Sequence, residues 1–405
     1  MPRFRAAVLL VLLAATATAA RRRSAAAPGG THPGVFPLHA VELVADTSDL
    51  YPLRLTIGHA GIVALGDSTH GTREFFTIKL RILDYLVRER GFDVLSLEAP
   101  FAIAERLNVY AQGGPGDPRA LLRELDERLV YLFWNVEELL AVIEWVRAYN
   151  AHRGDRPPVE IAGADVYDET GAVAGVLAYL RRTDPAAAAI AEQEYACVLA
   201  QDRAVGCERR AGRVRDRLAA TPVASREYAD ALHYADVVLQ YFDNPRFEPR
   251  ERNMAANLLW IQQHRGSSRK VIHWGHQEHV GKLPTATTRG ETMGSLIAAQ
   301  LGSQYVAIGT LTGSGTFLQW RQLANGMFTE ELTTYPEPAE GSYEWHMRRF
   351  GMSAMFVPLR RLAVPGTSFR TAGTLSGWIT VAQPLAQKLD GVIYIDRTTP
   401  TTPLR

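Results

Sequence analysis

The sequence lacks the features that mark several specialised classes of protein. Only two of its 405 residues are cysteine, which excludes a disulfide-rich scaffold and a cysteine-based zinc cluster. Acidic and basic residues nearly balance, 43 against 44, so no overall charge draws the chain to nucleic acid or to an acidic surface. No internal repeat is present, and 47% of the residues are hydrophobic. This composition predicts an ordinary globular core with no nucleic-acid partner.

Long apolar runs are also missing, except at the N-terminus. Residues 1–20 combine Arg3 and Arg5 with an apolar stretch of about a dozen residues and a small-residue triplet at 17–19, a layout typical of a secretory signal peptide. The stretch is short for a bilayer-spanning helix. We therefore expect residues 1–20 to be a cleaved signal peptide and residues 21–37 a flexible leader. The mature protein is then expected to be secreted or periplasmic, without stable membrane insertion; an uncleaved anchor flanked by the arginines at 21–23 is the alternative.

The two cysteines, Cys197 and Cys207, are ten positions apart in a region with helical periodicity. In an exported protein, such a close pair is expected to form a local disulfide. Its short loop would stabilise the fold less than a long-range link.

Residues 38–405 predict one α/β domain, in which a sheet of mainly parallel strands has flanking helices and a large helical insertion. The insertion covers about residues 170–263, where the pattern is Ala-rich, charged and helical. Short apolar runs predict strands at 62–65, 94–97, 159–164, 271–274 and 305–311, with later candidates at 355–359 and 391–395. The Gly-rich stretch 312–315 is expected to be a turn.

The stretch from residue 61 to residue 100 predicts a strand, a helix and a second strand. Phe76, Leu80, Leu83 and Val87 recur at the spacing of one helical face, and Lys79 falls off that face. Strands joined in this way are parallel, so their C-terminal ends lie at the same edge of the sheet. Ligands of open α/β sheets bind at that edge.

Ionisable side chains follow each of the first four predicted strands. They are Asp67 with His70, Glu98, Asp165, and His276 with His279. A histidine held in one tautomer by a carboxylate can take a proton from water near neutral pH, and a second carboxylate or histidine can protonate a leaving group. Other histidine N–H groups can stabilise an oxyanion. These residues therefore predict a composite site for hydrolysis by water, without a covalent intermediate.

A serine nucleophile is the first alternative, because Ser68 follows the first strand in a Gly-Asp-Ser sequence. Hydrolases of that type also need an Asp-x-x-His near the C-terminus, whereas the match here, Asp230 and His233, lies in the helical insertion. The G-x-S-x-G elbow of the α/β-hydrolases is absent. We therefore expect Ser68 to shape the turn.

A metal site is the second alternative. No cofactor is expected, but a role for a divalent metal stays open, because the histidines and carboxylates at the strand ends are competent zinc ligands that could activate water.

The third alternative belongs to another class of function, an exported protein that holds a metal or small ligand without turnover.

Several segments, taken together, resemble the erythromycin esterase family. GDSTHGTREFF is similar to the family signature GE-A-THG-x-x-EFF, and LSLEAPF, FWNVEELLAVIEWVRAYN and IAGADV are similar to its next conserved segments. ERNMAANLLWI resembles its RDRxMAxN helix, HWGHQEHVG its WAHN-x-H-V-G loop, and IDRTTP its last motif. The segments follow the family order.

The resemblance implies a role for each of these residues. His70 matches the general base, Glu98 the catalytic glutamate, and Asp67 a catalytic carboxylate that is usually Glu. The resemblance also implies that His276, His279, Glu74 and Asp165 bind the substrate, a small carboxylic ester or macrolide-type lactone. Gly275 and Gln277 replace the usual Ala and Asn. The oligomeric state is left open.

Overall fold

The computed structural model describes residues 32–126, 132–243, 247–284, 290–323, 328–373 and 377–404. The predicted signal peptide and most of the predicted leader lie outside these residues. Within the described residues, no helix has the length and apolar character needed to cross a bilayer.

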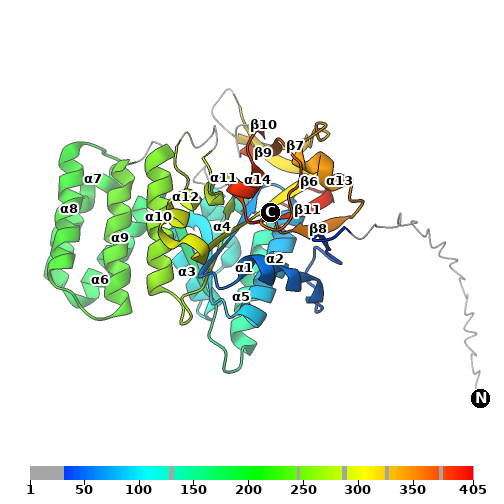
Figure 1. Cartoon of the computed structure of the whole chain (residues 1–405). Helices are drawn as coiled ribbons and strands as arrows, with labels where there is room; N and C mark the ends of the chain where they lie inside the picture. Colours follow the sequence, from blue (N-terminus) through cyan, green and yellow to red (C-terminus); the bar gives the residue numbers. More distant parts are fainter. Residues whose placement is uncertain are drawn as a thin grey trace, which may run out of the picture.

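The fold is a mixed α/β fold built on a nine-stranded sheet, as the sequence predicts (Figure 1). The strand order is β1-β8-β11-β6-β2-β5-β3-β4, with β7 paired to β6, and neighbours from β11 to β4 are parallel. The strands of this sheet are β1 (Phe36–Pro37), β2 (Ile62–Asp67), β3 (Val94–Pro100), β4 (Glu160–Asp165), β5 (Val271–His276), β6 (Tyr305–Gln322), β7 (Phe328–Thr334), β8 (Ala354–Val357) and β11 (Gly391–Thr398). A separate hairpin consists of β9 (Phe369–Gly373) and β10 (Gly377–Val381).

Helices cover both faces of the sheet, which explains why its central strands are continuous apolar runs. One face carries Val63, Leu95 and Ile272 and packs against α2 (Arg73–Arg90), α3 (Phe101–Ala111) and α5 (Glu137–His152). The other face carries Ala64 and Val271 and packs against α10 (Phe247–His264), α12 (Met293–Leu301) and α13 (Tyr343–Arg348). Shorter helices are α1 (Arg54–Ile57), α4 (Pro118–Asp126), α11 (Gln277–Val280) and α14 (Leu385–Lys388).

The predicted strand–helix–strand unit is present as β2, α2 and β3. The two strands are parallel but not adjacent, because β5 lies between them and pairs with both. The C-terminal ends of β2, β3, β4 and β5 therefore lie along one edge.

The prediction of a turn at 312–315 is wrong, because β6 continues through it to Gln322. A Cβ on Gly313 would stand 2.3 Å from the hydroxyl of Tyr394, and one on Gly315 would stand 2.1 Å from the carbonyl oxygen of Thr398. These glycines therefore allow β11 to approach closely. The outer half of β6 pairs with β7, a hairpin that the sequence did not predict.

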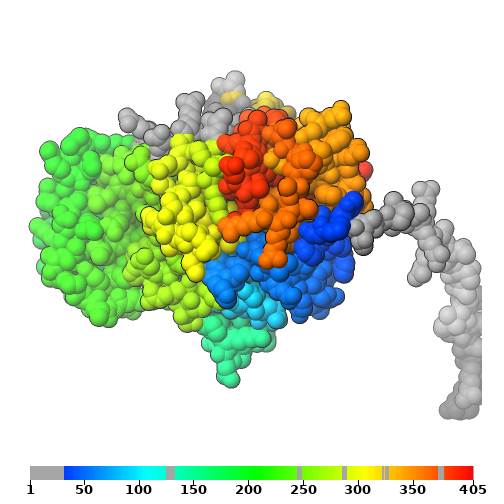
Figure 2. All heavy atoms as spheres, in the orientation of Figure 1, coloured from blue at the N-terminus to red at the C-terminus, as the bar shows by residue number. Residues whose placement is uncertain are grey.

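Four helices form a lobe at one end of the molecule, drawn in green in Figure 2. They are α6 (Glu169–Thr183), α7 (Pro185–Leu199), α8 (Val205–Ala220) and α9 (Arg226–Asp243). The hydrophobic core of the lobe also includes Phe101 of α3, and Trp260 of α10 packs against it. The predicted disulfide between Cys197 and Cys207 joins α7 to α8 within it. Helix α10 stands between the lobe and the sheet (Figure 1).

Candidate active site

The edge formed by the four strand ends gathers the ionisable side chains that the sequence singled out. Asp67, Asp165 and His276 are the last residues of β2, β4 and β5, and Glu98 lies near the end of β3. Their side chains are almost completely buried. Charges in such a place interact strongly, because little water screens them.

His70 lies in the turn after β2, with one ring nitrogen near each of two carboxylates. Its Nδ1 is 2.9 Å from Oδ1 of Asp67, and its Nε2 is 4.0 Å from Oε2 of Glu98. The ring stacks on Phe133, with centroids 3.8 Å apart and planes 9° from parallel. The orientation of the imidazole is thus fixed from the side and from its face.

A buried lysine that the sequence placed off the apolar face of α2 supports Asp67. The Lys79 ammonium group contacts Oδ2 of Asp67, and both side chains are about 1% exposed. Burial alone would raise the pKa of Asp67, but Lys79 and His70 outweigh it and hold that pKa below its usual value. Burial lowers the pKa of Lys79 to about 8, against the opposing effect of Asp67. Asp67 is therefore an anion at neutral pH.

The turn itself is held by three hydroxyl groups. The Tyr335 hydroxyl lies 3.0 Å from that of Thr69 and 2.7 Å from that of Thr72, which flank His70. The carbonyl oxygen of Ser68 accepts hydrogen bonds from the backbone N–H of Ala372 and the hydroxyl of Thr371. These backbone contacts favour a turn-shaping role for Ser68.

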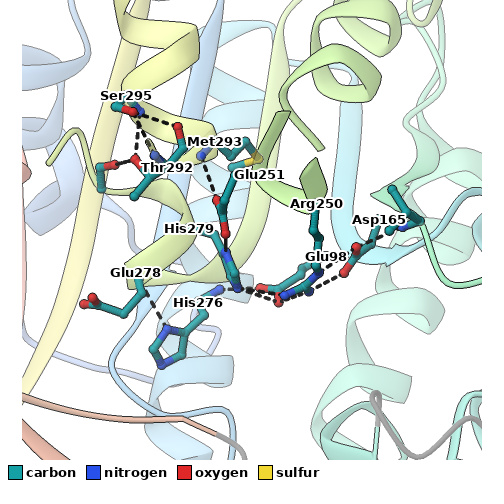
Figure 3. A network of polar contacts seen from close by, with 12 residues as sticks. Glu98, Asp165, Arg250, Glu251, His276, Glu278, His279, Thr292, Met293 and Ser295 are labelled. Atoms are coloured by element: carbon teal, nitrogen blue, oxygen red, sulfur yellow. Dashed lines mark hydrogen bonds and ion pairs between the residues drawn. The ribbon is translucent and has the colours of Figure 1, made fainter. Parts of the chain in front are cut away.

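Glu98 is surrounded by donors, as Figure 3 shows. Its Oε2 accepts a hydrogen bond of 2.7 Å from the backbone N–H of His276, and its Oε1 accepts one of 3.0 Å from Arg250. Nε2 of His279 lies 3.4 Å from Oε1. Burial would raise the pKa of Glu98, but His279, His70 and Arg250 hold it well below its usual range. Glu98 is therefore a permanent carboxylate and a poor proton donor.

Arg250 was not predicted as a site residue, although it lies in the helix segment similar to RDRxMAxN. It donates to both oxygens of Asp165, at 3.0 and 2.5 Å, as well as to Glu98. Burial opposes its charge, but the two carboxylates raise its pKa well above the usual value. One guanidinium group thus links the ends of β3 and β4 (Figure 3).

His279 also lies beside Glu98. Its Nδ1 contacts Oε1 of Glu251, whose Oε2 accepts a hydrogen bond of 2.8 Å from the backbone N–H of Met293. Burial and Arg250 oppose protonation, but Glu251 and Glu98 raise the pKa of His279 to about 9. Nη1 of Arg250 also lies 3.2 Å from Nε2 of His279 and can donate to it only while that nitrogen carries no proton. Glu251 is next to Arg250 in α10 and was likewise not predicted.

His276 lies at the site, but both of its ring nitrogens face backbone groups. Nδ1 accepts a hydrogen bond of 3.2 Å from the N–H of Glu278, and Nε2 lies 3.2 Å from the carbonyl oxygen of Ala372. Burial, helped by His70, lowers its pKa to about 4, so the ring is neutral. The side chain caps α11, and the backbone N–H contacts Glu98.

Two other predicted substrate-binding residues also have partners within the chain. Glu74 accepts hydrogen bonds from the backbone N–H and the hydroxyl of Thr399, at 2.7 and 2.6 Å. It thereby anchors the C-terminal segment to the start of α2. Asp165 is held by Arg250, as described above.

The site contains no metal-binding arrangement among the residues the structure describes, since no three His, Cys, Asp or Glu side chains converge suitably. Two protein cations, Lys79 and Arg250, instead contact the carboxylates that the sequence offered as ligands.

A cavity of about 10 Å³ lies beside His70, which is the size of one water molecule. Its walls come from the His70 turn, the outer half of β6 and strand β9. The lining residues are Thr69, His70, Gly71, Phe317, Leu318, Gln319, Trp320 and Ala372.

Comparison with known proteins identifies the family. The erythromycin esterase family matches residues 87–402, which include Glu98, Arg250 and His279. A putative hydrolase of Bacillus subtilis (strain 168), YbfO, is 23% identical, and the alignment covers 88% of each chain. Erythromycin esterase type II of Escherichia coli is 23% identical over 86% of this chain and 92% of that protein.

Among solved structures, a mutant erythromycin esterase in its open conformation is similar, with a TM-score of 0.70. The alignment covers 89% of this chain and 96% of that chain at 17% identity, so it supports the fold alone. The match to the family covers most of the sequence and includes three of the four strand ends at the site. The chain therefore belongs to the erythromycin esterase family, and this membership indicates hydrolase activity.

Proposed function

We propose that the protein is an exported hydrolase that cleaves a carboxylic ester or a macrolide-type lactone with a water molecule activated by His70. The observation that carries the proposal is the placement of His70 between two carboxylates, with Nδ1 at 2.9 Å from Asp67 and Nε2 at 4.0 Å from Glu98. Family membership supports the hydrolytic class.

The geometry suits proton abstraction from water. Asp67, kept anionic by Lys79, favours the tautomer with the proton on Nδ1 of His70, which leaves Nε2 free to accept a proton. A water molecule about 2.8 Å from both Nε2 and Oε2 of Glu98 would fit the 4.0 Å gap with a nearly right angle between its two contacts. Glu98 then orients the water, because its low pKa excludes it as the acid.

The reaction balances without a cofactor. The water O–H bond breaks as its proton goes to Nε2 of His70, and the oxygen forms a bond to the ester carbon while the carbonyl π electrons move to oxygen. The tetrahedral intermediate collapses by breaking the C–O bond to the alcohol, which takes the proton back from Nε2. The products are a carboxylic acid and an alcohol. His279, whose pKa is raised to about 9, is a candidate to stabilise the oxyanion.

The test is a panel of p-nitrophenyl acetate, p-nitrophenyl butyrate and erythromycin with the purified protein, with and without EDTA. His70→Ala should lower kcat by roughly 10²–10⁴-fold, the usual contribution of a positioned base. Glu98→Gln should lower kcat more than it raises KM, because it removes charge and keeps shape. Ser68→Ala serves as the matched control and should retain most activity.

Four outcomes would overturn the mechanism. Full activity of folded His70→Ala would remove the base, and loss of activity only in Ser68→Ala would indicate a serine nucleophile. Loss of activity with EDTA and recovery with added zinc would favour the metal-dependent alternative. Binding of an ester without turnover would favour a non-catalytic binding protein.

Export is tested separately, by N-terminal sequencing of the protein secreted by its native host. A mature N-terminus near residue 20 is expected from the signal-like layout of the first residues. Recovery of intact Met1 would contradict it.

A further inference from the structure

A fourth histidine lies beneath the site, and the mechanism above does not use it. His273 is in the middle of β5, directly opposite Ser96 of β3 in the sheet register. Gly275 lies two residues further on in β5, on the same face as His273, and Glu98 lies beside it, since a Cβ on Gly275 would stand 2.9 Å from its Oε2. Ser96 and His273 therefore lie directly behind the catalytic carboxylate on the side that α10 covers.

His273 is a buried polar group with one ring nitrogen unused. Its side chain is 0% exposed, and Nδ1 lies 3.1 Å from the hydroxyl oxygen of Ser96. Nε2 has no hydrogen-bond partner among the residues the structure describes. An unsatisfied polar atom in such a place is costly, so a native protein usually gives it a partner or a task.

Gly275 places no side chain between this nitrogen and Glu98. A Cβ on residue 275 would stand 3.1 Å from Nε2 of His273 and 2.9 Å from Oε2 of Glu98, so both atoms border the same small region. Oε2 is the oxygen that faces His70 and accepts the N–H of His276. A carboxylate oxygen can accept a second hydrogen bond.

We propose that His273 is a positioning residue for Glu98: the Ser96 hydroxyl donates to Nδ1, the proton stays on Nε2, and this N–H holds Oε2 of Glu98 toward His70. Because Nε2 makes no direct hydrogen bond among the described residues, the contact would run through one water molecule bound between the two atoms. Burial lowers the pKa of His273 to about 4 despite the opposing effect of Glu98, so the ring stays neutral and adds no charge to the site. This inference rests on the proposed hydrolytic role of Glu98.

Two amide substitutions separate the positioning role from simple packing. The amide nitrogen of His273→Gln can stand where Nε2 does, whereas that of His273→Asn can stand where Nδ1 does. Gln therefore keeps a donor toward Glu98, and Asn keeps only the contact to Ser96. Both variants place a neutral amide in the same buried position, so each is the control for the other.

We expect His273→Asn to lower kcat roughly 10-fold or more at nearly unchanged KM, the effect of losing one hydrogen bond to a charged group. His273→Gln should stay within about 3-fold of the wild type. Equal kcat in the two variants, with wild-type melting temperatures, would overturn the proposal. Even then, the proposed function would still hold if His70→Ala abolishes activity in the same assay.

A second measurement does not depend on turnover or on the stability of the variants. The ¹⁵N NMR signals of selectively labelled histidine in the wild-type protein report which ring nitrogen of His273 carries the proton. We expect the proton on Nε2, and a shift of this signal in the Glu98→Gln protein. A proton on Nδ1, donated to Ser96, would overturn the proposal.

Discussion

Removal of Arg250 should destabilise the protein, because it leaves two buried carboxylates, Glu98 and Asp165, without their cation. The side chains of Glu98 and Asp165 are 3% and 0% exposed, and each contacts the guanidinium group. Breaking a buried ion pair by removing one partner costs about 3–5 kcal/mol, since the remaining charge stays buried. With an unfolding entropy of about 2.1 cal/mol/K per residue, this predicts a melting temperature about 4–6 °C lower for Arg250→Met.

The loss of stability in Arg250→Met should depend on pH, and the shifted pKa of Glu98 sets the direction of this dependence. Burial raises the pKa of Glu98, and His279, His70 and Arg250 lower it, so the stability it contributes is present above its unfolded pKa and is lost as the pH falls. Without Arg250 the folded pKa of Glu98 is higher, and the carboxylate takes up a proton more readily. The gap in melting temperature between the wild type and Arg250→Met should therefore narrow as the pH is lowered from about 6 to about 3, through the ordinary glutamate pKa of 4.5.

Differential scanning calorimetry at these pH values measures the effect. Two controls accompany it: Arg250→Lys keeps a charge without the two-pronged contact, and adding Asp165→Asn to Arg250→Met removes one of the two orphaned charges. Each control should recover part of the lost stability. A melting temperature within about 1 °C of the wild type, or a gap that is the same at every pH, would refute the electrostatic account.

Three further predictions follow from individual contacts. Glu74→Gln should lower the melting temperature by about 1–3 °C through the weaker hold on Thr399 and leave kcat within a few-fold, whereas a large rise in KM would restore the substrate-binding role. Replacing Cys197 and Cys207 by Ala should cost about 2–3 kcal/mol of stability in calorimetry, and mass spectrometry under non-reducing conditions should find no free thiol in the wild type. The pKa of His279 in the folded protein is raised from 6.5 to about 9, so the stability that its charge contributes is fully present below 6.5 and is lost as the pH rises through about 9. The gap in melting temperature between the wild type and His279→Gln should narrow between these two pH values, and a widening gap would contradict the assignment.

The strand ends could be predicted from the sequence because their geometry is local. Each buried strand is a short apolar run, parallel strands share an edge, and the side chain after the run lies at that edge, as for Asp67, Glu98 and Asp165. The site residues that come from helices could not be predicted in this way. Periodicity places Lys79 outside the apolar stripe of α2, yet its side chain is 1% exposed because it reaches the end of β2.

Residues whose contacts are far away in the sequence are even harder to predict from local patterns. Arg250 and Glu251 stand in a polar stretch at the start of α10, which predicts an exposed helix end unless the sheet edge beside it is known. Gly313 illustrates the opposite error. A local pattern of glycines indicates a turn, but the space that Gly313 leaves is occupied by Tyr394 of a strand that follows 80 residues later.

The hydrophobic core of the α6–α9 lobe has a consequence for how far the lobe could be changed. The described residues that hold the carboxylates come from strand ends, α2, α10 and α11, and the lobe supplies none of the charged contacts to Glu98 or His70. The disulfide joins α7 to α8, the outer pair of helices, whereas α6 and α9 pack against α3 and α10. A designer could therefore exchange α7 and α8 while α6 and α9 kept their places, and the charged contacts around Glu98 and His70 would stay unaltered.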